Sequence, residues 1–262
     1  MKSIITQSEV FLEQEYFDDK STSLKDIIID GLNIRFLLKD VDSRELRVTT
    51  ISDKERDGYH ERELLFEDQN VGTFFVTLLI PHEERDSYFA ILGLPGHGTW
   101  NQDFIENYHA GDLARAGFIV IIPFMRAMMD WESDHAVSKH LLCNGFTLMG
   151  LRVYESLLTL KYLKYLEEVD SNKIGILAHS GGAAIANLLI YVTDDFKALL
   201  RDYNSNYLDI ILEKLHCETI PSIFPFYMLI NSKESTPIAI LETPYGFKVN
   251  REDIIVFFNQ HL

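Results

Sequence analysis

The feature that most constrains the fold is the alternation of apolar and amphipathic segments through the middle of the chain. Short apolar runs, with the length and composition of buried strands, occur at 88–95, 118–125, 173–180 and 196–203. Segments with helical spacing of apolar residues separate them, at 104–117, 148–166 and 182–193. Such strands and helices pack as a mostly parallel sheet covered on both faces, so the sequence predicts an α/β fold.

The flanking parts of the chain divide it into two predicted regions. Residues 1–57 are mixed and acidic, with helix-like spacing, and we expect a helical N-terminal extension. Residues 58–262 are predicted to be the main domain, which opens with an antiparallel hairpin from 61–68 and 71–81. Its C-terminal part carries a cap-like insertion at about 204–235, a strand within 236–244 and a closing helix capped by Asn250.

Charge and cysteine content exclude several classes of function. The chain of 262 residues has 24 basic and 40 acidic side chains, a net charge of −16, so nucleic acid and anionic membranes are not expected as partners. The two cysteines, Cys143 and Cys217, lie far apart and form no metal-binding spacing, so we expect reduced, partly buried thiols and no metal or cofactor. No targeting segment or long apolar run is seen, which predicts a cytoplasmic protein.

The sequence ILAHSGG places a serine at the junction of a strand and a helix. Ser180 is flanked by the small residues Ala178, Gly181 and Gly182, which a very tight strand-to-helix turn requires. In this nucleophile elbow, the serine hydroxyl projects above the sheet at the positive end of the helix. The alternative is that Ser180 only caps the helix. We expect His179 to pack sideways as a structural histidine.

A second glycine-rich turn, PGHG, follows the strand at 88–95. In an acyl-transfer site of this kind, one oxyanion donor is the backbone N–H after the nucleophile, and the other comes from this loop. These donors would be the backbone amides of Gly181 and His97. Taken alone, PGHG is an ordinary turn; together with the serine elbow it favours an oxyanion hole.

The chain resembles the α/β-hydrolases over roughly residues 60–203, especially the branch similar to acetyl xylan esterases and dienelactone hydrolases. The resemblance rests on AILGLPGHGT, LARAGFIVIIPFMR, VDSNKIGILAHSGGAAIANLL and FKALLRDY. It implies a twisted, mainly parallel, eight-stranded sheet, with a small cap after the sixth strand. It also implies hydrolysis of small-molecule carboxylic esters by a serine, a histidine and an acid.

The C-terminal part departs from this family at the expected base. Tyr245 stands where the family's catalytic histidine follows the last strand. His261 is excluded because it lies at the far end of the closing helix, roughly 15 Å from the catalytic edge. His216, in the cap-like insertion, is the remaining candidate base, with Asp202 as candidate acid; the alternatives are a cap-packing histidine and a solvated carboxylate.

Two further segments bear on the site. The stretch after the strand at 118–125 is predicted to be a loop, in which Met128, Met129 and Trp131 either line an acyl pocket or pack the cap. Glu155 lies where the family often has aspartate, and we expect it on a helix surface.

Two hypotheses of different classes follow. The first is an esterase-like serine hydrolase, with Ser180 as nucleophile and the amides of His97 and Gly181 as oxyanion donors. The second is a pseudohydrolase that retains the elbow, lacks the catalytic histidine and acid, and binds a ligand or a partner. The sequence does not define the substrate or the oligomeric state.

Overall fold

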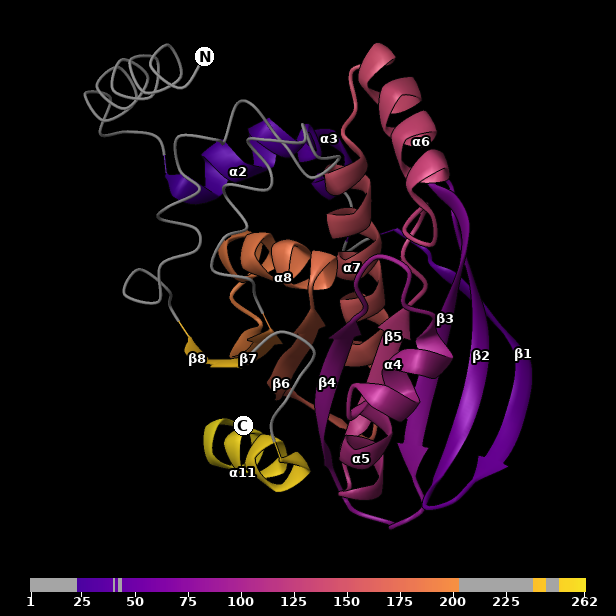
Figure 1. The fold of residues 1–262 in the computed structure, drawn as a ribbon, viewed down its shortest axis with the longest axis vertical. Helices are drawn as coiled ribbons and strands as arrows, with labels where there is room; N and C mark the ends of the chain where they lie inside the picture. The colour runs from indigo at the N-terminus through magenta and orange to yellow at the C-terminus, as the bar shows by residue number, and fades with distance from the viewer. Residues whose placement is uncertain (1–22, 40, 42–43, 203–237, 244–249) are drawn as a thin grey trace.

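The computed structural model describes residues 23–39, 41, 44–202, 238–243 and 250–262. Within these ranges the chain alternates strands and helices, as the sequence predicts (Figure 1). In chain order the elements are α2 (Leu24–Leu32), α3 (Arg35–Leu38), β1 (Arg47–Arg56), β2 (Tyr59–Asp68), β3 (Gly72–Pro81), β4 (Tyr88–Leu94), α4 (Asn101–Asn107), α5 (Ala110–Arg115), β5 (Ile119–Pro123), α6 (Trp131–Cys143), α7 (Leu148–Tyr165), β6 (Val169–His179), α8 (Gly181–Val192), β7 (Phe196–Asp202), β8 (Ala239–Thr243) and α11 (Arg251–His261).

All the described strands belong to one eight-stranded sheet, in the order β1-β2-β3-β5-β4-β6-β7-β8. The first three strands form an antiparallel meander, and β3 pairs antiparallel with β5. From β5 to β8 every neighbouring pair is parallel. The predicted fold class and the predicted hairpin are therefore confirmed.

Helices cover both faces of this sheet, as parallel strands require. On one face, the helices α2, α3, α7 and α8 pack their apolar side chains over the central strands. On the other face, α4, α5 and α11 do the same, with Phe104, Leu113 and Phe258 fully buried. Figure 1 shows α7 and α8 on the opposite side of β4 and β6 from α5 and α11. The central strands are thus buried on both sides, which explains their continuous apolar sequences.

The prediction that residues 1–57 are helical is wrong for 47–56, which form strand β1. This strand lies at the sheet edge and is mostly exposed, so its sequence lacks the apolar alternation of a half-buried strand. A hairpin signal was nevertheless present: Asp57 and Gly58 join Arg56 to its register partner Tyr59, and Gly58 has a φ of +86°. Asp-Gly is a preferred pair for such two-residue turns.

Two helical predictions also need correction. The single helix predicted at 104–117 is two helices, because His109 adopts a left-handed φ of 65° between α4 and α5. The loop predicted after β5 contains helix α6, whose first turn is capped by the Asp130 side chain, which accepts from the Ser133 amide at 2.7 Å. Its largely polar sequence has no apolar stripe to reveal a helix.

Other predictions fall on parts of the chain that the structure does not describe. The cap-like insertion at 204–235, with His216 and Cys217, lies outside the described residues, as does Tyr245. Cys143 is a free thiol but is exposed, which corrects the expected partial burial. Asn250 caps α11 as predicted, with its side chain accepting from the Glu252 amide. In the part of the chain described here, no helix combines the length and the apolarity needed to cross a membrane.

Candidate active site

Ser180 occupies a strained turn between the end of β6 and the start of α8. Its backbone has φ 49° and ψ −114°, a conformation that costs a non-glycine residue about 1–3 kcal/mol. Its side chain makes no helix-capping hydrogen bond, whereas its carbonyl oxygen accepts from the Ala183 amide at 2.9 Å. The alternative interpretation of Ser180 as a simple helix cap therefore loses its main support. A sharp, strained turn from a strand into a helix is also the geometry that a nucleophile elbow requires.

Glycines allow neighbouring backbones to approach this turn closely. A Cβ added to Gly182 would lie 2.0 Å from the carbonyl oxygen of Leu94 at the end of β4. A Cβ on Gly96 would lie 2.8 Å from Ser180 Cβ and 2.9 Å from His179 Cδ2. All three distances are shorter than real Cβ contacts, so α8 and the loop after β4 reach their positions only because Gly182 and Gly96 have no side chain.

The loop after β4, which contains the predicted oxyanion donor His97, passes close to the serine at Gly96. Gly96 contacts the elbow, His97 follows it, and the Gly98 amide donates to the Met128 carbonyl at 2.8 Å. Gly181 is the first residue of α8, where a backbone N–H has no acceptor within the helix. The N-terminal end of α8 also carries positive partial charge. The chain thus places His97 and Gly181 on two segments that border the same serine.

The side chain of His97, in the loop after β4, lies next to a buried ion pair between Asp134 and Arg152. His97 Nε2 lies 3.5 Å from Asp134 Oδ2, and Asp134 Oδ1 accepts from Arg152 Nη2 at 2.7 Å. The side chains of Asp134 and Arg152 are both 0% exposed. Arg152 also donates from Nε to the Arg126 carbonyl at 3.0 Å. Asp134 on α6, itself paired with Arg152 on α7, therefore contacts the side chain of His97. No pattern in the sequence indicates this ion pair.

Beneath the elbow, His179 pairs with Asp202. The imidazole Nδ1 lies 2.7 and 2.8 Å from the two carboxylate oxygens, and one of these oxygens also accepts from the Ser180 amide at 2.9 Å. Both side chains are buried, and the ring of Tyr108 packs against His179 at 4.2 Å. The structure thus brings Asp202 to the backbone of Ser180.

The remaining candidate bases are placed as follows. His216 lies outside the described residues, so its role stays a prediction. His261 ends α11 and packs against Phe257, with ring centroids 4.9 Å apart. Of the residues predicted either to line an acyl pocket or to pack, Met128 is buried in the hydrophobic core. The side chain of Trp131 lies outside the described part of the structure.

Glu155 is buried, not on the helix surface as predicted. It lies on α7 and is 1% exposed, and its carboxylate accepts from Arg126 Nε at 2.7 Å. Arg126 donates in addition to the carbonyl of Val71 at 3.0 Å. Burial raises the pKa of Glu155 from its ordinary 4.5 to about 7, and the neighbouring Arg126 opposes that rise. This pair links α7 to the strands at the antiparallel side of the sheet.

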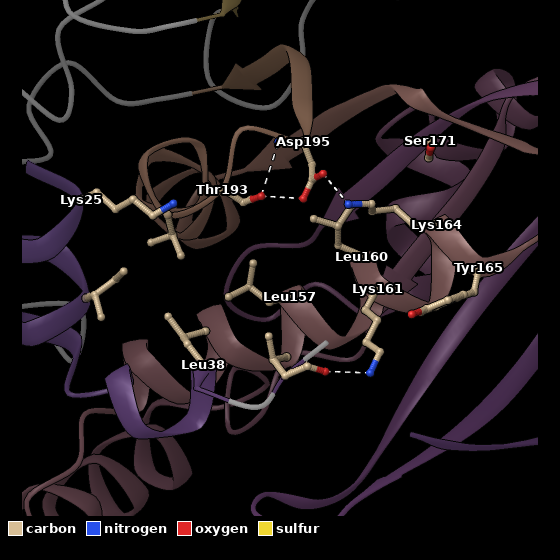
Figure 2. Close-up of a pocket in the computed structure, with 13 residues that line it drawn as sticks. Lys25, Leu38, Leu157, Leu160, Lys161, Lys164, Tyr165, Ser171, Thr193 and Asp195 are labelled. Carbon is tan, nitrogen blue, oxygen red and sulfur yellow. Dashed lines mark hydrogen bonds and ion pairs between the residues drawn. The ribbon is translucent and has the colours of Figure 1, made fainter. Parts of the chain in front are cut away.

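A separate pocket of about 600 Å³ lies at the far end of α8 from Ser180. Its wall includes Val192 and Thr193 after the last turn of that helix, and three lysines from α2 and α7 (Figure 2). Two of these lysines are engaged: Lys164 pairs with Asp195 at 2.5 Å, and Lys161 donates to the Val41 carbonyl at 2.7 Å. This pocket is therefore distinct from the serine site.

Solved structures with a similar fold are esterases. A methylesterase has a TM-score of 0.62 and 15% identity over 90% of this chain and 62% of its own. The acetyl xylan esterase from Paenibacillus sp. R4 has a TM-score of 0.61 and 11% identity, over 92% of this chain and 96% of its own. Acetyl xylan esterase 1 from Thermoanaerobacterium sp. JW/SL YS485 has a TM-score of 0.59 and 9% identity, over 89% and 93%.

The chain spans only 62% of the methylesterase and 54% of a similar protein from Bacteroides fragilis. No family model and no curated protein matches the sequence. At these identities the likeness is one of fold, and in this chain the described residues form a mixed eight-stranded sheet with helices on both faces. The protein has the α/β-hydrolase fold of acetyl xylan esterases and related esterases.

Proposed function

We propose that the protein is a serine-dependent carboxylic-ester hydrolase with Ser180 as its nucleophile. The observation that carries this proposal is the strained backbone of Ser180, φ 49°, at the strand-to-helix turn, combined with the absence of a helix-capping hydrogen bond from its side chain. Strain of this kind persists where the surrounding structure enforces it, and it is concentrated at active sites. The esterase neighbours support ester hydrolysis as the reaction class.

In the proposed reaction, Ser180 Oγ attacks the carbonyl carbon of the ester while a base accepts the hydroxyl proton. The carbonyl oxygen becomes negatively charged and receives hydrogen bonds from the backbone amides of His97 and Gly181. Collapse of this intermediate releases the alcohol, which takes up the proton from the protonated base. Water then attacks the acyl-enzyme in the same way, releasing the acid and restoring Ser180.

The proposal assigns the base to His216 and gives Asp202 a positioning role. Asp202 faces the Nδ1 atom of the buried His179 and holds the Ser180 amide, so it fixes the elbow. This arrangement supports a structural His179, as the sequence predicts. His179 remains the alternative base, because the edge of its ring and the side chain of Ser180 border the same residue, Gly96.

The substrate class is proposed from the names of the neighbours and from charge. Methylesterases and acetyl xylan esterases act on esters with a one- or two-carbon group on one side, so we propose a small ester with such a group. The net charge of −16 disfavours strongly anionic substrates at long range.

The test is covalent labelling by a fluorophosphonate probe, with hydrolysis of p-nitrophenyl acetate as the activity assay. Ser180→Ala is expected to abolish labelling and to reduce kcat/KM by at least about 10³-fold. His216→Gln and His179→Gln identify the base. The base is the histidine whose replacement reduces activity to the same extent as Ser180→Ala. Ser138→Ala, at a half-exposed position of α6, is the matched control and should retain full activity.

One result would overturn the hydrolase proposal. The proposal fails if the wild-type protein neither reacts with the probe at Ser180 nor hydrolyses p-nitrophenyl acetate above the Ser180→Ala background. The elbow would then have no catalytic function. The pseudohydrolase, a binding protein built on the same fold, would then take its place.

A further inference from the structure

Three side chains that are typical metal ligands converge on the antiparallel part of the sheet. Glu55 Oε1 lies 2.8 Å from His82 Nε2, and Glu55 Oε2 lies 3.1 Å from His60 Nδ1. The three ligand atoms that Glu55, His60 and His82 can offer all lie within 4.8 Å of one another. The two imidazoles meet edge to face, with centroids 4.7 Å apart and planes at 68°.

The sheet register explains this convergence. Glu55 on β1 is the direct partner of His60 on β2. His60 in turn is paired with Ile80 on β3, and His82 follows two residues later, so it points to the same face of the sheet as Ile80. The His82 amide extends the strand pairing by donating to the Gly58 carbonyl at 3.1 Å. Backbone hydrogen bonds therefore hold all three side chains on one face.

We propose that Glu55, His60 and His82 form a binding site for a divalent transition-metal ion, with Zn²⁺ as the ion of choice. Two imidazole nitrogens and one carboxylate are a donor set that zinc accepts at about 2.0–2.2 Å. Ligand atoms around a tetrahedral zinc ion lie about 3.3 Å from one another, and the three candidate atoms here all lie within 4.8 Å of one another. Glu55 and His82 are exposed, so their side chains can adjust to a bound ion.

A second carboxylate borders this site. Asp53 Oδ1 lies 3.8 Å from His60 Nδ1, while its other oxygen accepts from Arg62 Nε at 2.7 Å. Arg62 is the cross-strand partner of Asp53, so it keeps this carboxylate in place beside the histidine. Asp53 thus supplies either a fourth ligand or a negative charge close to the ion.

The proposed site is remote from Ser180. Because β3 runs antiparallel to β5, its end at Pro81 lies toward the amino ends of the parallel strands, whereas Ser180 follows the carboxyl end of β6 (Figure 1). The ion would join β1, β2 and the end of β3. Its role is structural: it would hold the edge hairpin to the sheet, independently of ester hydrolysis.

The test is titration of the tag-free full chain with Zn²⁺ by isothermal calorimetry, with thermal unfolding in the presence and absence of the ion. We expect one site, a higher unfolding temperature with Zn²⁺, and affinity reduced by more than about tenfold in His60→Gln, His82→Gln and Glu55→Gln. His140→Gln removes an exposed histidine of α6 and should leave the affinity unchanged.

Two results would overturn the proposal. One is the absence of stoichiometric binding at Zn²⁺ concentrations up to about 100 μM, which leaves the cluster as a histidine–carboxylate interaction only. The other is equal binding by wild type, the three ligand variants and His140→Gln. Neither result bears on the labelling of Ser180.

Discussion

His179 Nδ1 lies 2.7 Å from the Asp202 carboxylate directly below the serine elbow, and the two residues are also register partners on the parallel strands β6 and β7. The same carboxylate accepts a hydrogen bond from the Ser180 amide. One buried acid therefore joins the ends of two strands to the backbone of the proposed nucleophile. Its removal should affect both stability and the elbow.

Asp202→Asn tests this link. The variant loses the negative charge, and only one of its two terminal side-chain atoms, the amide oxygen, can still accept a hydrogen bond. We expect the free energy of unfolding to fall by about 1.5–3 kcal/mol, measured by urea denaturation, with reduced probe labelling of Ser180. Asp195→Asn, which affects a half-exposed pair with Lys164, should cost less than about 1 kcal/mol. Equal losses in both variants would contradict a special role for Asp202.

Gly182→Ala tests the close approach of α8 to β4. The new Cβ would meet the Leu94 carbonyl at 2.0 Å, so either the helix or the strand end must move. We expect a loss of stability of about 1–3 kcal/mol or more, and a loss of esterase activity larger than the loss of stability explains. The control is Gly72→Ala, where a Cβ meets nothing within 4 Å and only the positive φ is strained. Similar behaviour of both variants would rule out crowding as the cause.

Asp134→Asn tests the buried ion pair behind the His97 loop. Without the carboxylate charge, the fully buried guanidinium of Arg152 is left uncompensated, which typically costs about 3–5 kcal/mol. The double variant Asp134→Leu with Arg152→Met should recover part of that loss, as measured by chemical denaturation. A loss below about 1 kcal/mol in the single variant would show that the pair contributes little.

Glu155→Gln tests the effect of a buried carboxyl on the pH dependence of stability. The folded protein binds this proton more tightly than the unfolded chain, because the pKa is about 7 when folded against an ordinary 4.5. This group therefore lowers stability as the pH rises from 4.5 to 7, and its full cost is present above 7.

The glutamine variant should accordingly show a smaller loss of stability between pH 5 and pH 8 than wild type, by about 1–3 kcal/mol. Its amide oxygen can still accept from Arg126, which limits other effects of the change. Urea denaturation at the two pH values measures the difference, with Glu132→Gln on the exposed side of α6 as control. If the pH dependence of stability is the same in the variant and in wild type, groups other than Glu155 cause it.

The central strands and the strand-to-helix turn at Ser180 could be predicted because their sequences face a single environment. Strands β4 and β6 are covered on both faces and read as continuous apolar runs, and the glycines around Ser180 reflect a steric need visible in the chain itself. Strand β1 escaped prediction because an exposed edge imposes no such pattern, although Asp57 and Gly58 marked its turn.

The pairs that organise the site were harder to predict, since they join residues distant in the chain. His179 and Asp202 are 23 residues apart, but alignment of the two strand ends would have placed them side by side. Asp134 and Arg152 lie on two helices, and the polar sequence of α6 concealed the first of these. The spacing of residues along a sequence indicates which of them lie on the same face of a helix or strand. Which residue on another element they contact is known only from the packing of the folded chain.

The exposed edge strand β1 has a consequence for the behaviour of the protein in solution. An unpaired strand edge can template pairing with another chain, and charged side chains are a common protection against this. Among the exposed or half-exposed residues of β1 are Arg47, Lys54 and Arg56, beside Asp53 and Glu55. The charges that disguised this strand in the sequence thus act as a barrier to edge-to-edge aggregation.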